Sequence, residues 1–303
     1  MNSRLTEIRV PMFDDSVVVQ FESVEQMASV RACVAGRVSG ARLPPQEWCE
    51  INADVPPDLI VSVRDLDDAW VEIEYGGLVE VPRYRVDRAG LHWDFSKIVT
   101  AVLLPRLIEG GTVPLHAAVI GARGGVLLPG SSGAGKSSVS FAALDANLAV
   151  YASELAFVQR GQLVAANSTL TIDPVAAALL GGEPAAPTLV DSRLTQPLAP
   201  LPENGVAIVG LAFPKVCDAP LRVRDITPRR ARMLLFENIV SQLPVSQLVA
   251  HESEPLSLLP TRSQLRTIAD ECQRLSELKP TIVEGRPDDV LGHIVTMFEL
   301  AAP

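Results

Sequence analysis

Hydrophobic and polar residues alternate in short segments over the first 95 residues of the chain. Segments such as "SVVVQFES" (16–23) and "AWVEIEYGG" (69–77) carry β-branched or aromatic residues at every second position. A period of two predicts strands that turn one face toward a core. Helical spacing interrupts this pattern in "SVEQMASVRACVAGRV" (23–38). We therefore predict a small β-rich N-terminal domain over 1–95, followed by a connecting helix over 96–111.

From residue 112 onward the pattern changes, because strand-like apolar runs alternate with segments of helical spacing. The strand-like runs lie at 113–120, 124–130, 147–159, 205–214 and 280–285. The helical segments lie at 135–146, 228–243, 262–278 and 287–301. Such alternation predicts an α/β domain. We place this domain at 112–303, with a long proline-rich loop at 181–205.

Two of the predicted helices carry further local signals. Thr227 followed by Pro228 is typical of a helix N-cap and a proline in the first turn. In 262–278 several apolar side chains share one helical face, which predicts the buried side of that helix. They are Leu265, Ile268, Ala269, Cys272 and Leu275.

Composition narrows the class of protein. The 303 residues are 48% hydrophobic and 20% charged, with a formal net charge of −10. An acidic chain is a poor candidate for nucleic-acid or anionic-membrane binding, so we expect neither partner. The chain has no apolar run of the ~18 residues that a membrane span needs, and its first residues lack a signal-peptide core, so we expect a cytoplasmic protein. The four cysteines are scattered without a C-x-x-C pair, which indicates buried thiols rather than a zinc site.

The strongest chemical signal is "VLLPGSSGAGKSSVSFAAL" (126–144), where an apolar run stops abruptly and a glycine- and serine-rich turn follows. The turn fits G-x-x-x-x-G-K-[ST], the Walker A pattern of phosphate-binding loops. Glycines let the backbone wrap closely around phosphates, and the helix that follows directs its N–H groups and positive dipole end at the anion. The lysine adds charge for the terminal phosphates, and the serine hydroxyl after it suits Mg²⁺. The predicted nucleotide-binding residues are Gly130, Ser131, Ser132, Gly133, Ala134, Gly135, Lys136, Ser137 and Ser138.

The motif and its surroundings resemble one family of P-loop proteins. An LSGGQ-like signature and an N-K-x-D motif are absent from the sequence, which disfavours transport ATPases and GTPases. The stretch "PLHAAVIGARGGVLLPGSSGAGKSSVSFAAL" (114–144) is instead similar to the C-terminal domain of HPr kinase/phosphorylase and its relatives, which share a fold with phosphoenolpyruvate carboxykinases. The likeness continues weakly to about residue 298. It implies a P-loop mixed β-sheet domain that binds ATP and Mg²⁺.

The resemblance also implies site residues. The family's histidine near the transferred phosphoryl group matches His116, although a lone histidine on an apolar strand is often a core residue. The family's acidic pair after the next strand falls on Ser153 and Glu154. A serine has no pKa suited to accepting a proton near neutrality. Glu154 is therefore the candidate general base and, with Ser137, the candidate Mg²⁺ ligand; a solvated carboxylate at a strand end is the alternative.

Other basic residues are weaker candidates. Lys215 ends the run at 205–214, where related kinases carry a basic residue. Five arginines near "LRVRDITPRRAR" could stabilise transferred charge, but a solvated strand and helix N-terminus explain them as well. They are Arg222, Arg224, Arg229, Arg230 and Arg232.

Two classes of function follow. The first is an ATP-dependent kinase of the HPr-kinase-like group in which His116, Lys136 and Glu154 act on the transfer of the γ-phosphate to a hydroxyl of a peptide, a protein or a small alcohol. The second is a nucleotide-binding switch or scaffold of weak activity, because Ser153 replaces the family's aspartate. A nucleotide-dependent hydrolase or phosphorylase is a third reading. The resemblance also leaves a homo-oligomer open, because the namesake enzymes form hexamers.

Overall fold

The computed structural model describes most of the second half of the chain and the strands of the first. The described residues are 6–12, 15–21, 49–50, 59–65, 70–77, 81–87, 104–122, 124–172, 188–190, 193–242 and 260–300. The chain divides into two compact units and passes from the first into the second between Pro105 and Arg106. Residues 104–109 are helical, whereas the rest of the predicted connecting helix before 104 lies outside the described residues.

The described part of the first unit is a six-stranded sheet with the order β3-β1-β2-β4-β5-β6. Its strands are β1 (Thr6–Met12), β2 (Asp15–Phe21), β3 (Cys49–Glu50), β4 (Leu59–Asp65), β5 (Trp70–Gly77) and β6 (Val81–Asp87). β2 and β4 run parallel, and the other neighbours are antiparallel. Val18 and Val19 are both buried, so both faces of β2 are covered. The helix predicted at 23–38 lies outside the described residues.

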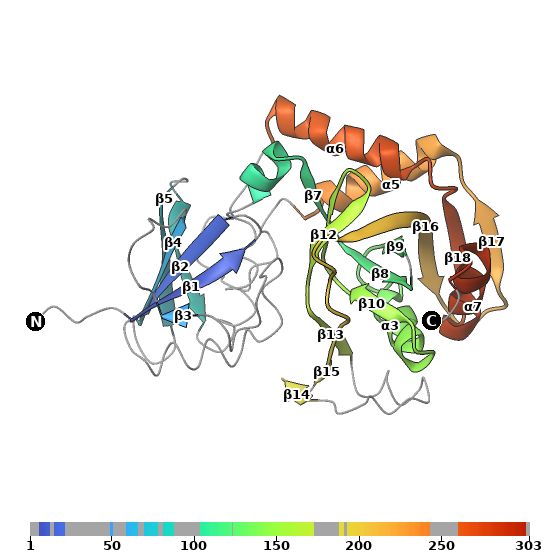
Figure 1. Cartoon of the computed structure of the whole chain (residues 1–303), viewed down its shortest axis with the longest axis horizontal. Coiled ribbons are helices and arrows are strands. Elements are labelled where there is room, and N and C mark those ends of the chain that lie inside the picture. The colour runs from blue at the N-terminus through green and yellow to red at the C-terminus, as the bar shows by residue number, and fades with distance from the viewer. Residues whose placement is uncertain are drawn as a thin grey trace, which may run out of the picture. The chain divides into compact units, whose positions relative to one another are not determined.

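The second unit is mixed α/β, as predicted for the fold class, and is built on a nine-stranded sheet of mostly antiparallel strands (Figure 1). Its main path runs β10-β8-β9-β16-β12-β11-β7, and β18 and β17 continue from β16. These strands are β7 (Thr112–Leu115), β8 (Ala117–Gly121), β9 (Gly125–Pro129), β10 (Ala149–Ala152), β11 (Ala156–Gln159), β12 (Gln162–Ala166), β16 (Val206–Val216), β17 (Arg222–Asp225) and β18 (Thr281–Gly285). The labelled helices are α3 (Lys136–Asp145), α5 (Pro228–Val240), α6 (Arg262–Leu275) and α7 (Pro287–Met297).

The long strand β16 organises this sheet. Its start pairs with β12, its middle runs parallel to β9, and its end runs parallel to β18. The carboxyl ends of β9, β16 and β18 therefore lie at the same end of the sheet. In open sheets with parallel strands, the carboxyl ends of the strands are the usual place for a ligand.

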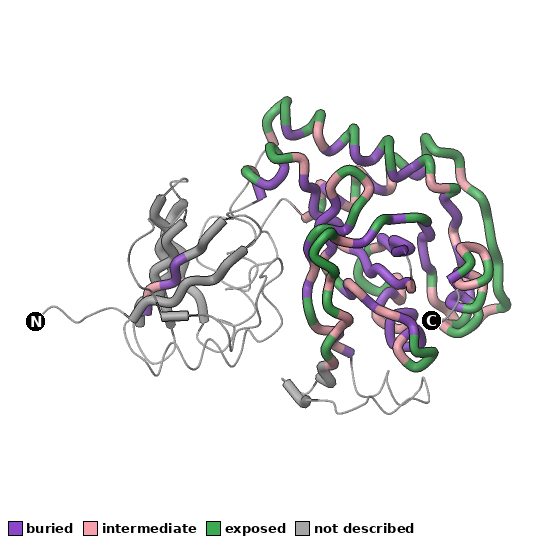
Figure 2. Tube along the Cα trace, viewed as in Figure 1, coloured by how far each residue is buried: buried purple, intermediate pink, exposed green. Residues whose placement is uncertain are grey.

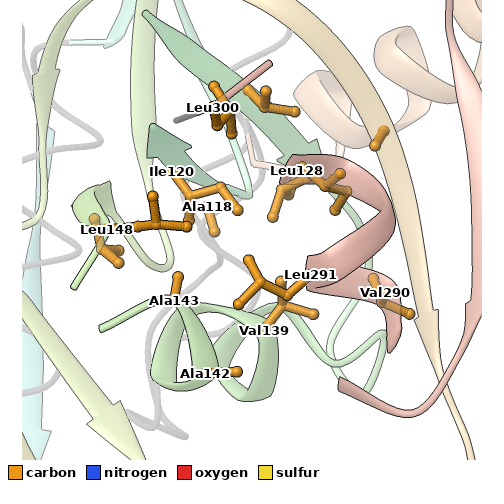
Figure 3. Close-up of a cluster of buried hydrophobic side chains, with 14 of the residues drawn as sticks. Ala118, Ile120, Leu128, Val139, Ala142, Ala143, Leu148, Val290, Leu291 and Leu300 are labelled. Carbon is orange, nitrogen blue, oxygen red and sulfur yellow. The ribbon is translucent and has the colours of Figure 1, made fainter. Parts of the chain in front are cut away.

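Two helices pack over one core cluster of the second unit (Figure 3). Val139 of α3 and Leu291 of α7 meet the sheet residues Ile120 and Leu128 there, and all four are buried. α5 and α6 pack against each other and against β7. None of the helices in the described part is both long and apolar enough to cross a membrane.

Two expectations about strands changed. The run 147–159 is two strands, β10 and β11, because the turn at Ser153–Glu154 separates them. The proline-rich stretch at 181–205 contains strands β14 (Thr188–Val190) and β15 (Arg193–Pro197), which pair with each other and, through β15, with β13 (Thr169–Ile172). The prolines there do not prevent pairing, since Pro197 closes β15 at its last residue, where a missing N–H is tolerated.

The N-cap prediction for α5 is confirmed, whereas the buried face predicted for α6 is partly wrong. The Thr227 hydroxyl accepts a hydrogen bond from the Arg230 N–H at 3.3 Å. On α6, Leu265 and Ala269 are exposed, and Gln264 and Glu271 are buried with Ile268, Cys272 and Leu275. The helix is rotated in this way because the Glu271 carboxylate accepts the backbone N–H groups of Arg160 and Gly161, in the turn between β11 and β12, at 3.1 and 2.7 Å.

We expect Ile294→Ala to lower the free energy of unfolding by about 2–5 kcal/mol, because it leaves a cavity where α7 meets the core. Thr296→Ala, on an exposed position of the same helix, is the matched control and should change it by less than about 0.5 kcal/mol. Urea unfolding followed by circular dichroism measures both values. Equal losses in the two variants would contradict the packing of α7 into this core.

Candidate functional site

A tight glycine-rich turn joins β9 to α3, and its backbone is tied to the rest of the sheet at both ends. We call residues Gly130–Gly135 the 130–135 loop. At its start, the Gly130 N–H donates to the His116 carbonyl at 3.2 Å. At its end, the Ala134 carbonyl accepts a hydrogen bond at 3.0 Å from the N–H of Val216, which is the last residue of β16. Ser131, Ser132 and Gly133 are exposed at the tip. The loop is thus a fixed turn at the carboxyl edge of the sheet with its tip open to solvent.

Two glycines of the loop are required by the geometry. Gly135 has φ of 93°, and a Cβ there would lie 2.2 Å from the Cβ of Val216. No other residue type fits that approach. Gly133 has φ of 81°, and a Cβ there would meet nothing within 4 Å. Open space at a left-handed position on the loop tip leaves the backbone N–H groups approachable, which suits the close binding of a phosphate group.

The helix that follows the loop begins without a capping side chain. Gly135 is the N-cap residue of α3, no side chain caps the helix, and no acidic residue lies in its first turn. The N-terminal N–H groups and the positive end of the helix dipole are therefore available to an anion. Ser137 and Ser138 are half-buried in this first turn.

Lys136 is the first residue of α3 and folds back over the loop. Its Nζ donates to the carbonyl oxygens of Gly130 at 2.8 Å and of Ser131 at 3.0 Å. The residue is only 5% exposed, and within the described residues no carboxylate lies at ion-pair distance from it. Burial lowers the pKa of Lys136 to about 8, although the nearby charge of Glu154 opposes that change. A buried ammonium held by neutral carbonyls is costly, and an anionic ligand would relieve that cost.

His116 lies at the bend between β7 and β8, beside the loop. Its backbone N–H donates to the Asn238 side-chain oxygen at 2.9 Å, and its backbone carbonyl accepts from the Asn238 amide nitrogen at 3.1 Å. Asn238 comes from α5, so that helix fixes the backbone at this bend. Burial, and then the charge of Lys136, lower the pKa of His116 to about 4. The imidazole is therefore neutral at neutral pH, able to donate a hydrogen bond but a weak base.

Ser153 and Glu154 lie in the turn between β10 and β11, and one buried asparagine orders that turn. The Asn167 side-chain oxygen accepts the N–H groups of Ser153, Glu154 and Leu155 at 3.1–3.2 Å. The Asn167 amide donates to the Ser153 hydroxyl at 2.8 Å, and that hydroxyl donates to the Thr169 carbonyl at 2.9 Å. Ser153 is thus a buried structural residue, 3% exposed, rather than a group that faces a substrate.

Glu154 has the opposite environment. Its side chain is exposed, and its carbonyl accepts from the Ala117 N–H at 3.1 Å, next to His116. Its charge also reaches Lys136, because it raises the pKa of that lysine against the effect of burial. The structure therefore gathers His116, Lys136 and Glu154 around the 130–135 loop.

The donor set suits Mg²⁺ only together with a ligand. No group of three or more His, Cys, Asp or Glu side chains in the described part of the chain could hold a metal by itself. The Ser137 hydroxyl and the Glu154 carboxylate are two oxygen donors, and Mg²⁺ in nucleotide sites commonly takes one or two protein oxygens with phosphate oxygens and water. These two residues fit that pattern.

The other basic candidates lie elsewhere on the second unit. Lys215 is exposed near the end of β16 and pairs with Glu284 of β18 at 3.1 Å. Arg222 and Arg224 are exposed on β17, and Arg229, Arg230 and Arg232 are exposed at the start of α5. Arg232 bonds to Gln273 of α6.

Asn167 and Asn238 are the two residues of this site that the sequence did not predict. Asn167 bonds to groups 2 to 14 residues away in the chain and Asn238 to a residue 122 away, and neither asparagine belongs to a recognisable motif. The hydrogen-bond partners of the two asparagines could not be identified before the fold was known. No family model and no curated protein matches the chain.

We expect Asn167→Ala to lower the free energy of unfolding by about 2–4 kcal/mol, because it leaves buried backbone donors without partners. Asn204→Ala removes the same side chain from an exposed turn and should be nearly neutral. Thermal or urea unfolding of both variants measures the difference. A neutral Asn167→Ala variant would contradict the role given to this network.

Proposed function

We propose that the chain is an ATP-dependent phosphotransferase with a P-loop domain of the HPr-kinase-like type. The single observation that carries the proposal is the buried Lys136 ammonium, held at two loop carbonyls without a counter-ion among the described residues. It lies at the start of an uncapped helix in a complete Walker A sequence. A triphosphate supplies the charge that this arrangement lacks, and the exposed loop tip gives it access.

The roles of the surrounding residues follow from their environments. The 130–135 loop and the first turn of α3 would bind the phosphates, and Lys136 would pair with the terminal ones. Ser137 and Glu154 would hold Mg²⁺, which supplies neutralisation of charge on the transferred group. Glu154 is exposed and anionic, so it is also the group that could accept a proton from an acceptor hydroxyl. Neutral His116 would donate a hydrogen bond. Catalysis of this kind is mostly positioning and electrostatics.

A second candidate function is a nucleotide-binding switch or scaffold. It is favoured by Ser153, which stands where the resemblance expects an aspartate. The Ser153 hydroxyl is already hydrogen-bonded to Asn167 and Thr169. In that case Glu154 would contribute to binding alone. The two functions differ in one measurable respect, because only the first transfers phosphate.

We expect Lys136→Ala to weaken binding of a fluorescent ATP analogue about 10- to 150-fold, the equivalent of a charge-assisted hydrogen bond of about 1.5–3 kcal/mol.

Glu154→Gln should retain nucleotide binding measured without Mg²⁺ and lower phosphate transfer from γ-labelled ATP about 10²- to 10⁴-fold. Glu203→Gln, at an exposed turn, is the matched control and should leave both unchanged. Binding without transfer in the wild-type protein would select the switch, and absence of any nucleotide binding would refute both functions.

We also expect nucleotide affinity to depend on pH through Lys136. The free protein has a Lys136 pKa of about 8, and a bound triphosphate favours the charged form and raises that pKa. Binding above pH 8 must therefore take up a proton, and Kd should rise by up to about tenfold per pH unit there. Titration calorimetry from pH 7 to 9.5 measures this. Lys136→Arg remains protonated, so any binding it retains should be independent of pH; a flat wild-type profile would exclude the mechanism.

A further inference from the structure

The second unit ends in an open sheet edge that the proposed phosphate site does not use. β17 pairs with β18, and within the described residues no strand pairs with its other side. All four residues of β17 are exposed (Figure 2). An edge strand of this kind offers unpaired N–H and C=O groups that can form a ladder with an added strand.

Positive charge gathers on one face of this edge. Arg222 lies opposite Glu284, and Glu284 lies opposite Lys215, so the three side chains share a face of the sheet. Arg224, two residues further along β17, lies on that face too. Lys215 forms an ion pair with Glu284, whereas Arg222 and Arg224 form no ion pair with any described residue.

The charge of this region is opposite to that of the whole chain. Residues 215–232 contain six basic and two acidic side chains, a net charge of +4, whereas the chain carries −10. The hydrogen bond from Lys215 lowers the pKa of Glu284, and the charges of that lysine and both arginines lower it further. The Glu284 carboxylate thus lies among three cations, whereas Asp225, at the end of β17, lies on the opposite face of the sheet. The field on the face of Arg222 and Arg224 therefore attracts further negative charge.

Apolar side chains complete the pattern. Val223 lies between the two arginines and is 39% exposed, and Leu221, just before β17, is 42% exposed. A strand that pairs with β17 presents alternate residues to the same two faces. Acidic residues at i and i+2 would therefore lie beside the arginines, and an apolar residue between them would lie beside Val223.

We propose that β17 is a docking edge for an extended acidic peptide of the type acidic–apolar–acidic, which binds by strand addition. Charge complementarity favours this occupant over a second copy of the chain, because two such edges would bring like charges together. The backbone ladder supplies affinity, and the pairing of carboxylates with Arg222 and Arg224 supplies selectivity.

The position of the edge relates it to the phosphate site. Arg222 lies opposite Glu284, and Glu284 lies opposite Lys215, near the carboxyl ends of β18 and β16 and at the end of the sheet where the 130–135 loop lies. β17 is three strand positions from β9, a distance of about 14 Å, which four or five extended residues can span. If the proposed phosphotransferase function holds, on which this step rests, the docked peptide is the acceptor and its hydroxyl lies a few residues from the acidic segment.

Fluorescence anisotropy with labelled peptides tests the docking itself, without nucleotide. The probe TEVEVEVT should bind the wild-type protein, and the basic probe TKVKVKVT should not. Arg222→Glu with Arg224→Glu should weaken TEVEVEVT binding by at least about tenfold. Arg262→Glu with Arg266→Glu, two exposed arginines of α6 that lie outside the basic region, is the matched control and should retain it. Methylation of alternate backbone nitrogens in TEVEVEVT keeps its charge but removes ladder donors, and should abolish binding.

Each contrary result overturns the proposal. Equal losses in the two double variants, or undiminished binding of the N-methylated peptide, would mean attraction by charge without strand addition. Binding of phosphatidylserine vesicles in place of the peptide would assign the edge to a membrane surface. Lys136→Ala should bind TEVEVEVT normally and the β17 double variant should bind nucleotide normally, so failure of the docking site and failure of the proposed function are distinguishable.

Discussion

The close approach of Gly135 to Val216 is the constraint on which the candidate site depends. It brings the end of the 130–135 loop against the end of β16, and the hydrogen bond from the Val216 N–H to the Ala134 carbonyl holds it there. β16 is itself fixed by pairing with β9 on one side and with β12 and β18 on the other. The loop conformation is thus a property of the whole sheet, and a side chain at position 135 would disturb both.

Two asparagines extend this control to the residues beside the loop. Asn238 ties the backbone of His116 to α5, and the carbonyl of His116 in turn accepts from the first residue of the loop. Asn167 does the same for the turn that carries Glu154. One side-chain amide can satisfy several backbone groups at once, so its replacement leaves several of them without a partner. Polar contacts therefore help the hydrophobic core to hold groups from three separate segments around one loop.

The sequence predicted what depends on local pattern and missed what depends on distant partners. The strand–turn–helix around Lys136 and the N-cap at Thr227 could be predicted because each is encoded within a few residues. The buried face of α6 could not, because Glu271 is buried to accept N–H groups of a turn about 110 residues earlier in the chain. The resemblance placed Ser153 at a catalytic position, whereas its hydrogen bonds make it part of the scaffold; only Asn167 and Thr169 in place reveal that.

The electrostatics of the loop lead to a final step. Lys136 lies in an environment that lowers its pKa, and it in turn lowers the pKa of His116, while Glu154 acts on Lys136 in the opposite direction. The charge states of these three groups therefore depend on one another. A polyanion bound at the loop would act on all three groups. It would favour the charged lysine and compensate the effect of that charge on the histidine, while repelling the glutamate unless a cation lay between them. On the proposed function, a phosphate bound at this loop would therefore require a divalent cation between it and Glu154.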